Sequence, residues 1–340
     1  MSDRAAVWLA AAELAAKGAP GAMATVSRHR GSLPMARDAK LVVAEHGEYW
    51  GTIGGGCTEA DVMAQALEAA KRGAPIVVRH TLNADLAGDV GLSCGGTAEF
   101  FLEPVVAELD GLYRAVARAI TERIPTLVST ALDWAAGPAK AARVGDRVVG
   151  TDVPGILTGV EHLPLTPTVD EQRGLFVEPV PRLPRVIVFG AGHVGNEIAR
   201  LAARAGFYVV VIDDRREFAD PSRLPGVDEV IVENLRTVLG RVRLDADDYV
   251  LATTRGHQFD AEIVEATAAS SARYVGMLGS ARKKAVIWKA LESLGVPRAA
   301  LERVRVPIGE RIGADTPAEI AVSVVAELIR VRRLGNPGRE

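Results

Sequence analysis

The fold is decided by the stretch Arg185-Val-Ile-Val-Phe-Gly190-Ala-Gly192-His193-Val-Gly195, in which an apolar run leads into three glycines. The run predicts a buried strand, and the spacing of the glycines predicts a tight turn that opens a helix. Gly190 permits the turn, Gly192 lets the backbone approach a pyrophosphate, and Gly195 lets the helix pack on the strand. His193 either contacts the ligand or faces solvent. We therefore predict a Rossmann-type nucleotide-binding domain, with the helix N-terminus facing a bound phosphate.

Strand and helix patterns alternate along the rest of the chain, which predicts a parallel sheet covered by helices on both faces. Further strands are predicted near 207–212, 229–232, 249–253 and 273–278, and a last helix near 317–332 begins with the capping-box pattern Thr316-Pro-Ala-Glu319. Asp213 follows the second strand, where a carboxylate can accept hydrogen bonds from ribose hydroxyls. An acid at this position favours a ribose without a 2′-phosphate. Arg215 and Arg216, which follow directly, weaken that preference. The alternative is a glycine turn that merely packs a helix on a sheet.

The N-terminal part of the chain mixes helices with short strands. Helices are predicted near 3–18, 59–71 and 109–122, and strands near 22–26, 40–44, 48–52, 76–81, 98–103, 126–132 and 143–149. Prolines between 154 and 184 disfavour regular elements and indicate a boundary. We therefore expect an α/β protein with an N-terminal α+β domain over 1–180 and a C-terminal doubly wound domain over 185–335. The pattern Phe-x-Glu-Pro-Val, at 101–105 and 176–180, marks either equivalent strand ends or a chance recurrence.

Length, charge and cysteine content narrow the class of protein. A chain of 340 residues favours two domains. With 40 Lys and Arg against 43 Asp and Glu, the formal net charge is -3, which supplies no basic surface for nucleic acid or an anionic membrane. No apolar run approaches the ~18 residues of a membrane span. Because only two cysteines occur, we expect reduced thiols, a cytoplasmic location, and small molecules or proteins as partners.

Each cysteine lies in a glycine-rich turn. The first turn is predicted between a strand and a helix, so its N–H groups can form an anion-binding nest, and the helix dipole would lower the pKa of the thiol. The second cysteine, Cys94, precedes Gly95. Two thiolates are too few for a structural zinc site, which typically has four ligands. Each thiol either contacts a bound ligand or is a small hydrophobic side chain buried in the core. The candidate binding residues of the first turn are Gly54, Gly55, Gly56, Cys57 and Glu59.

Several motifs, in order along nearly the whole chain, resemble the XdhC (CoxI-like) accessory proteins of xanthine dehydrogenase and related molybdenum hydroxylases. The motifs are residues 28–34, 51–59, 92–96, 189–195, 254–260, 274–280, 307–309 and 316–323. The resemblance implies a cytosolic maturation factor that binds molybdenum cofactor (molybdopterin), supports its sulfuration and delivers it to an apo-hydroxylase. It therefore implies an accessory protein or chaperone rather than an enzyme.

The resemblance also implies the ligands and partners. Cys57 and Cys94 become candidate molybdenum-proximal thiols, because molybdenum takes soft sulfur ligands. The expected partners are an apo-hydroxylase such as xanthine dehydrogenase, a cysteine desulfurase and, from base rates, a second copy in a homodimer. Two alternatives stay open: an NAD(P)-dependent oxidoreductase, and a module that senses another nucleotide. Against the oxidoreductase, the second domain has no Tyr-x-x-x-Lys pair.

Two more groups of candidate residues follow later strands of the predicted sheet. Arg255, Gly256 and His257 come after the strand near 249–253, and Gly279 and Ser280 come after the next one. Open α/β sheets bind their ligands at the carboxyl ends of their strands. We therefore include these residues in the predicted cofactor site.

Overall fold

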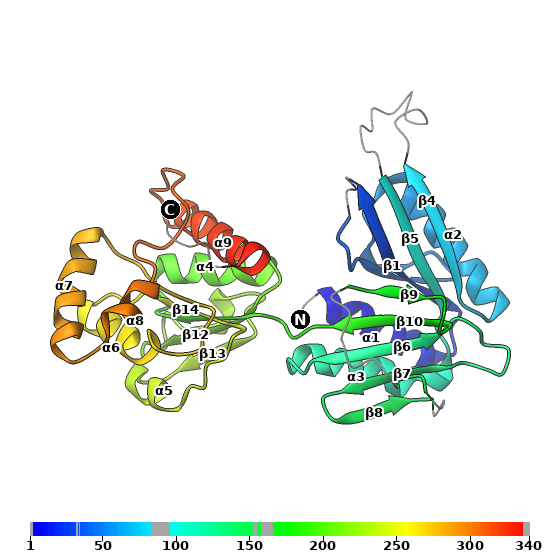
Figure 1. The fold of residues 1–340 in the computed structure, drawn as a ribbon, viewed down its shortest axis with the longest axis horizontal. Coiled ribbons are helices and arrows are strands. Elements are labelled where there is room, and N and C mark those ends of the chain that lie inside the picture. Colours follow the sequence, from blue (N-terminus) through cyan, green and yellow to red (C-terminus); the bar gives the residue numbers. More distant parts are fainter. Residues whose placement is uncertain are drawn as a thin grey trace. The chain divides into compact units, whose positions relative to one another are not determined.

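The computed structural model describes residues 3–31, 33, 35–82, 96–151, 155–157 and 166–335, with the backbone alone at Asp3, Cys57, Leu82 and His257. The chain divides into two compact units, an N-terminal unit up to Arg182 and a C-terminal unit from Leu183 (Figure 1). The N-terminal unit contains two antiparallel sheets, and the C-terminal unit contains one parallel sheet. None of the described helices is long and apolar enough to cross a membrane.

The C-terminal unit has the Rossmann-type sheet that the sequence predicts. Its strands pair in parallel in the order β13-β12-β11-β14-β15. They are β11 (Arg185–Phe189), β12 (Tyr208–Asp213), β13 (Glu229–Val232), β14 (Asp248–Ala252) and β15 (Tyr274–Met277). The chain runs outward from β11 to β13 and then returns to the other side of β11. The strand order therefore reverses between β11 and β14, and such a reversal is where open α/β sheets bind ligands.

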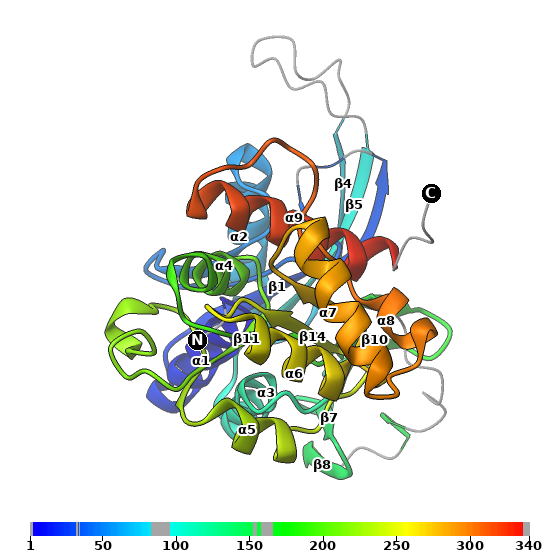
Figure 2. The same ribbon diagram turned by 90° about the vertical axis from the view of Figure 1, so that its left-hand side faces the viewer.

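Helices cover both faces of this sheet (Figure 2). They are α4 (His193–Arg204), α5 (Leu235–Arg241), α6 (His257–Thr267), α7 (Ala281–Ser293), α8 (Arg298–Arg303) and α9 (Pro317–Leu334), with a short helix η3 (Pro221–Arg223) after β12. Val186 and Val188 face the core shared with α4 and α9, whereas Ile187 and Phe189 face the core shared with α5, α6 and α7. This alternation follows from the two-residue period of a strand, and it explains why β11 is apolar throughout.

The N-terminal unit consists of sheets with the strand orders β3-β2-β1-β5-β4 and β8-β7-β6-β10-β9. Its first half contains α1 (Asp3–Lys17), β1 (Gly21–Gly31), β2 (Lys40–Ala44), β3 (Tyr49–Thr52), α2 (Gly56–Arg72), β4 (Ile76–Leu82) and β5 (Gly96–Pro104). Its second half contains η2 (Ala107–Leu109), α3 (Asp110–Thr121), β6 (Thr126–Ala131), β7 (Lys140–Val144), β8 (Arg147–Gly150), β9 (Thr168–Asp170) and β10 (Leu175–Val180).

Two sequence-based predictions for this unit were wrong. The single strand expected near 143–149 is a hairpin, β7 and β8, that turns at Gly145. The region 154–184, expected to lack regular elements, contains β9 and β10. Proline lacks a backbone N–H, so it fits a strand only where no neighbouring strand requires that donor. In β10 this condition is met at Pro179, because β9 pairs only with residues 175–177 and leaves that edge of the strand without a neighbour.

The two halves of the N-terminal unit repeat one topology, and their recurrent motif marks equivalent strand ends. Phe-x-Glu-Pro-Val ends β5 in one half and β10 in the other, and the rings of Phe101 and Phe176 stack with centroids 4.2 Å apart. The ion pairs between the halves are reciprocal. Lys40 of β2 pairs with Glu178 at 3.0 Å, and Lys140 of β7 pairs with Glu103. Equivalent positions therefore hold the halves together.

Candidate functional site

Two of the three glycines in the turn between β11 and α4 are required by the packing of the protein itself. A Cβ on Gly190, which has φ 108°, would lie 2.6 Å from the carbonyl oxygen of Thr253. A Cβ on Gly195 would collide with the carbonyl oxygen of Gly190. Gly192 is different, because its φ of -66° suits any residue and a Cβ there would have no heavy atom within 4 Å. Open space therefore borders the backbone at Gly192.

The first turn of α4 offers N–H donors to that space. Gly192 is the N-cap residue, and no side chain caps the helix. The first turn also contains no acidic residue that would neutralise the positive end of the helix dipole. His193, the first residue of the helix, is exposed. Such a terminus can hold a phosphate through its backbone.

Asp213 fixes the position of this turn. Its carboxylate is 3% exposed, and it accepts hydrogen bonds from the backbone N–H of Ala191 at 2.7 Å and from the Arg215 guanidinium at 2.9 Å. Burial raises the pKa of Asp213, but these hydrogen bonds outweigh burial and hold the pKa below its ordinary value of 3.8. A ribose hydroxyl would have to replace Arg215 on this carboxylate. The ribose role of Asp213 stays a prediction.

The loops after β14 and β15 reach the same sheet edge, because all strands of the sheet are parallel. The Thr253 hydroxyl donates to the carbonyl oxygen of Gly190 at 2.9 Å, so the β14 loop contacts the glycine turn directly. The Thr254 hydroxyl donates to Asp260 at 2.7 Å, and buried Asp260 forms an ion pair with Lys283. Thr253 and Asp260 were not among the predicted site residues. An acidic residue in the first turn of a helix after a buried strand was the available signal.

The predicted residues in these loops have distinct roles. Arg255 is exposed and forms no ion pair with the described residues, so its charge is available to a ligand. Gly256 is the N-cap residue of α6, and no side chain caps that helix. Ser280 caps α7 by accepting from the Lys283 N–H at 3.2 Å, and Gly279 makes room for the Lys283 side chain. Ser280 and Gly279 therefore shape the loop.

In the N-terminal unit, Glu59 organises the glycine loop that precedes α2. Its carboxylate accepts hydrogen bonds from the Thr52 hydroxyl at 2.6 Å and from the N–H groups of Ile53 and Gly55 at 2.8 and 3.2 Å. Burial raises the pKa of Glu59, but these bonds hold it below its ordinary value of 4.5. Gly54, Gly55 and Gly56 all have positive φ, which glycine adopts without strain. Glu59 therefore braces a loop that few other sequences could form.

The first turn of α2, which contains Cys57, adjoins one end of the sheet β3-β2-β1-β5-β4. Cys57 is the second residue of α2, which ends shortly before β4 begins, so the first turn of α2 lies toward the far end of β4 (Figure 1). His80, near that end, lies 3.4 Å from Asp61 in the second turn of α2. The connection from Leu82 to Gly96 starts at this end of the sheet. Cys94 and Gly95 belong to that connection and lie outside the described residues.

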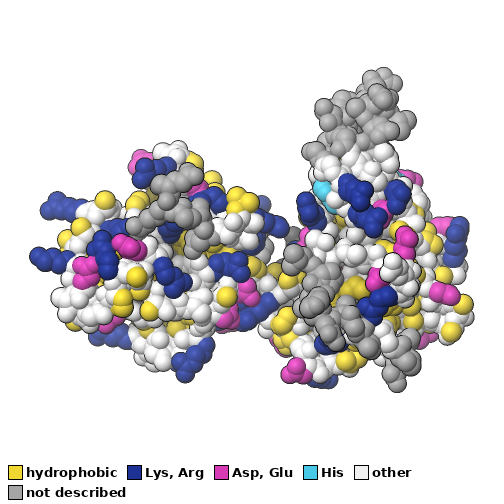
Figure 3. Space-filling model, viewed as in Figure 1, with side chains coloured by type: hydrophobic (Ala, Val, Ile, Leu, Met, Phe, Trp, Pro, Cys, Tyr) yellow, Lys and Arg dark blue, Asp and Glu magenta, His cyan; other side chains and the backbone are white. Residues whose placement is uncertain are grey.

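The described side chains do not form a metal site by themselves. No group of three or more His, Cys, Asp or Glu side chains is arranged to hold a metal ion in the part of the chain that the structure describes. Lys and Arg side chains are scattered over both units with Asp and Glu among them, on the face shown in Figure 3. Any metal contact through Cys57 and Cys94 stays a prediction.

Several known proteins are similar to this chain. A protein of Bacillus subtilis (strain 168) described as a probable xanthine dehydrogenase subunit is 28% identical over 92% of this chain and 93% of the relative. The molybdenum cofactor insertion chaperone PaoD of Escherichia coli (strain K12) is 24% identical over 95% of this chain and 86% of its own length. A crystal structure of a xanthine dehydrogenase from Bacillus halodurans superposes with a TM-score of 0.80 at 27% identity, over 100% of this chain and 98% of that chain.

Family models match both units. Residues 186–328 match the XdhC Rossmann domain, and residues 14–81 match the XdhC and CoxI family. The two matches together span more than half of the chain and include the glycine turns at Gly54–Gly56 and Gly190–Gly195. The chain therefore belongs to the XdhC and CoxI family.

Proposed function

We propose that this protein binds molybdenum cofactor and inserts it into a molybdenum hydroxylase such as xanthine dehydrogenase, as an accessory protein of the cytoplasm. The observation that carries the proposal is the free space at Gly192, beside an uncapped helix N-terminus that Asp213 holds in place. The cofactor carries a phosphate, and this terminus supplies N–H donors with no acidic residue in the first turn of the helix. The names of two relatives, one a molybdenum cofactor insertion chaperone, support the same role.

Each unit by itself contains groups that suit a part of the cofactor. The first turn of α4 would hold the phosphate, and Arg255 would add a positive charge at the same sheet edge. In the N-terminal unit, Cys57 and Cys94 are candidate soft sulfur donors for molybdenum. Cys57 is the second residue of α2. Insertion into another protein requires that the cofactor be released. A site with few strong ligands binds the cofactor reversibly and so permits this release.

The test is cofactor retention by the purified protein. Protein isolated under reducing, oxygen-free conditions is expected to contain molybdenum by metal analysis and molybdopterin by mass spectrometry, and to activate an apo-hydroxylase. In Gly192→Val the added Cβ has no protein heavy atom within 4 Å and the side chain enters the phosphate space, so cofactor content should fall at least tenfold with the melting temperature unchanged. Gly240→Val is the matched control, because Gly240 is exposed in α5 and its Cβ also has free space. Equal cofactor content in both variants would contradict the proposal that the phosphate binds at Gly192.

Replacing the thiols separates this function from its alternatives. Cys57→Ala and Cys94→Ala should each reduce delivery of cofactor to the apo-hydroxylase, whereas a nucleotide sensor would respond to its nucleotide as before. An NAD(P)-dependent oxidoreductase would bind or turn over nicotinamide, which absorbance detects directly. A cysteine desulfurase and a second copy of the chain are the further partners of this proposal, to be sought by pull-down and light scattering.

A further inference from the structure

β4 (Ile76–Leu82) is the longest of the strands that end a sheet in the described part of the chain (Figure 1). It has seven residues, whereas the other terminal strands, β3, β8, β9, β13 and β15, have three or four. All seven residues pair with β5 without a register shift, so no bulge turns the edge away. The other edge of β4 pairs with no strand among the described residues. Proteins usually keep edge strands short, bulged or covered, because their free N–H and C=O groups can pair with another chain, and β4 is neither short nor bulged.

Two rows of side chains cross β1, β5 and β4 next to this edge, on the sheet face opposite α2. They are Arg28, Glu99 and Arg79 in one row, and Arg30, Thr97 and Thr81 in the next. Arg28 and Arg79 both donate to the nearly buried Glu99 carboxylate, at 3.2 and 2.9 Å, and Arg79 is 64% exposed. Arg30 is exposed and forms no ion pair with the described residues. Three guanidinium groups therefore lie against one carboxylate in these rows, and Figure 3 shows Lys and Arg side chains at this end of the N-terminal unit.

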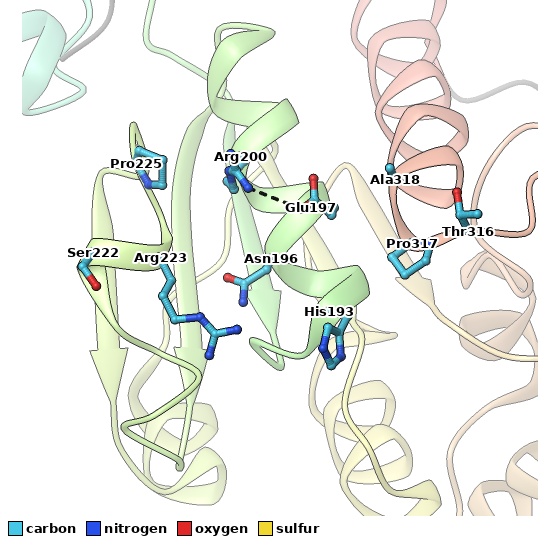
Figure 4. Close-up of a pocket in the computed structure, with 10 residues that line it drawn as sticks. All are labelled: His193, Asn196, Glu197, Arg200, Ser222, Arg223, Pro225, Thr316, Pro317 and Ala318. Carbon is cyan, nitrogen blue, oxygen red and sulfur yellow. Dashed lines mark hydrogen bonds and ion pairs between the residues drawn. The ribbon is translucent and has the colours of Figure 1, made fainter.

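This excess of positive charge distinguishes the rows from other charged groups of the protein. Arg200, which lines a pocket along α4, has the carboxylate of Glu197 to itself at 3.4 Å (Figure 4). On the α2 side of β4, His80 lies 3.4 Å from the carboxylate of Asp61. The excess positive charge beside β4 therefore lies on the face that carries Arg79.

The same charge argues against a second copy of the chain as the occupant of the edge. Antiparallel pairing of two β4 strands over their full length, residues 76–82, would place Arg79 at the centre, opposite Arg79 of the second copy. Like charges directly opposite each other destabilise a pair of strands. A carboxylate at that position would instead be attracted by Arg79 and by the charges of Arg28 and Arg30 behind it. The edge therefore suits an acidic strand of a different protein.

We infer that β4 binds an extended acidic segment of another protein by strand addition, with a carboxylate of that segment facing Arg79. Main-chain hydrogen bonds along β4 would supply affinity, and alternate side chains would supply specificity. Val77 lies on the same face as Arg79, is 43% exposed, and would pack against an apolar side chain of the added strand. The inference does not depend on cofactor binding, because neither Arg79 nor Val77 is a proposed cofactor ligand.

Fluorescence anisotropy of labelled peptides with the purified full chain tests the inference. The probe is a capped peptide of alternating valine and glutamate with the length of β4, and the control peptide has lysine in place of glutamate. The acidic peptide is expected to bind at least tenfold more tightly than the lysine peptide, a difference of about 1.4 kcal/mol. Arg79→Gln should weaken its binding at least fivefold with the melting temperature unchanged, because Arg28 still pairs with Glu99. Arg72→Gln is the matched control, because Arg72 is 63% exposed on α2, and it should leave binding within about twofold.

Methylation of the peptide backbone separates strand addition from simple charge attraction. A strand added at an edge pairs through one of its own edges, so only alternate N–H groups donate to β4. Methylating one alternate set of N–H groups should abolish binding, whereas methylating the other set should leave it within about threefold. The inference fails if the two methylated peptides bind alike, if the acidic and lysine peptides bind alike, or if Arg79→Gln behaves like Arg72→Gln. Gly192→Val should bind the peptide as the native protein does, so failure of the proposed function would leave these results unchanged.

Discussion

Replacing Lys140 by methionine is expected to destabilise the N-terminal unit strongly. The Lys140 side chain is 0% exposed and its ammonium group pairs with Glu103, whose side chain is 1% exposed. Burial lowers the pKa of Lys140, and the charge of Glu103 opposes that shift, so the two groups depend on each other. Lys140→Met leaves Glu103 as an uncompensated buried charge. Removing one partner of such a pair costs about 3–5 kcal/mol.

The assay is thermal and urea unfolding followed by circular dichroism. At ~2–4 °C per kcal/mol for a unit of this size, the transition of the N-terminal unit should fall by roughly 6–20 °C. Lys71→Met is the control, because Lys71 is 68% exposed on α2, and its effect should stay within about 0.5 kcal/mol. In the double variant Lys140→Met with Glu103→Leu, the loss should be at least ~2 kcal/mol smaller than the sum of the single losses. Additive losses, or a loss no larger than that of Lys71→Met, would refute the buried ion pair.

Three further predictions concern the C-terminal unit. Gly195→Ala should lower the free energy of unfolding by roughly 1–3 kcal/mol or more, measured by urea unfolding, because its Cβ collides with the Gly190 carbonyl. Asp213→Asn should lower the melting temperature at neutral pH, and the gap to the native protein should close as the pH falls below 3.8. The pKa of Asp213 in the folded protein lies below 3.8, so the ionised carboxylate stabilises the fold above pH 3.8 and this contribution is lost as the carboxylate is protonated. A difference in melting temperature that stays constant with pH would contradict this. Thr316→Ala removes the capping box of α9 and should cost about 1 kcal/mol, whereas an unchanged stability would show that the cap contributes nothing.

The local elements around the glycine turn were predictable because their causes lie within a few residues. The apolar run of β11 and the capping box at Thr316 were predicted, and the structure confirms both. The requirement for glycine at Gly190 and Gly195 was also predicted, since a tight strand-to-helix turn brings backbone atoms into contact. Such features depend on chain geometry and short-range sterics, so the sequence by itself determined them.

The tertiary structure decided which side chains meet. Lys140 pairs with Glu103 across 37 positions, and only the pairing of two sheets shows why a charged residue is buried there. Pro179 is compatible with a strand only because β9 stops short of it. Asp213 ends β12 close to where it was predicted, yet the folded chain directs its carboxylate to the N–H of Ala191, 22 positions away. These outcomes depend on contacts between distant segments, which no local pattern encodes.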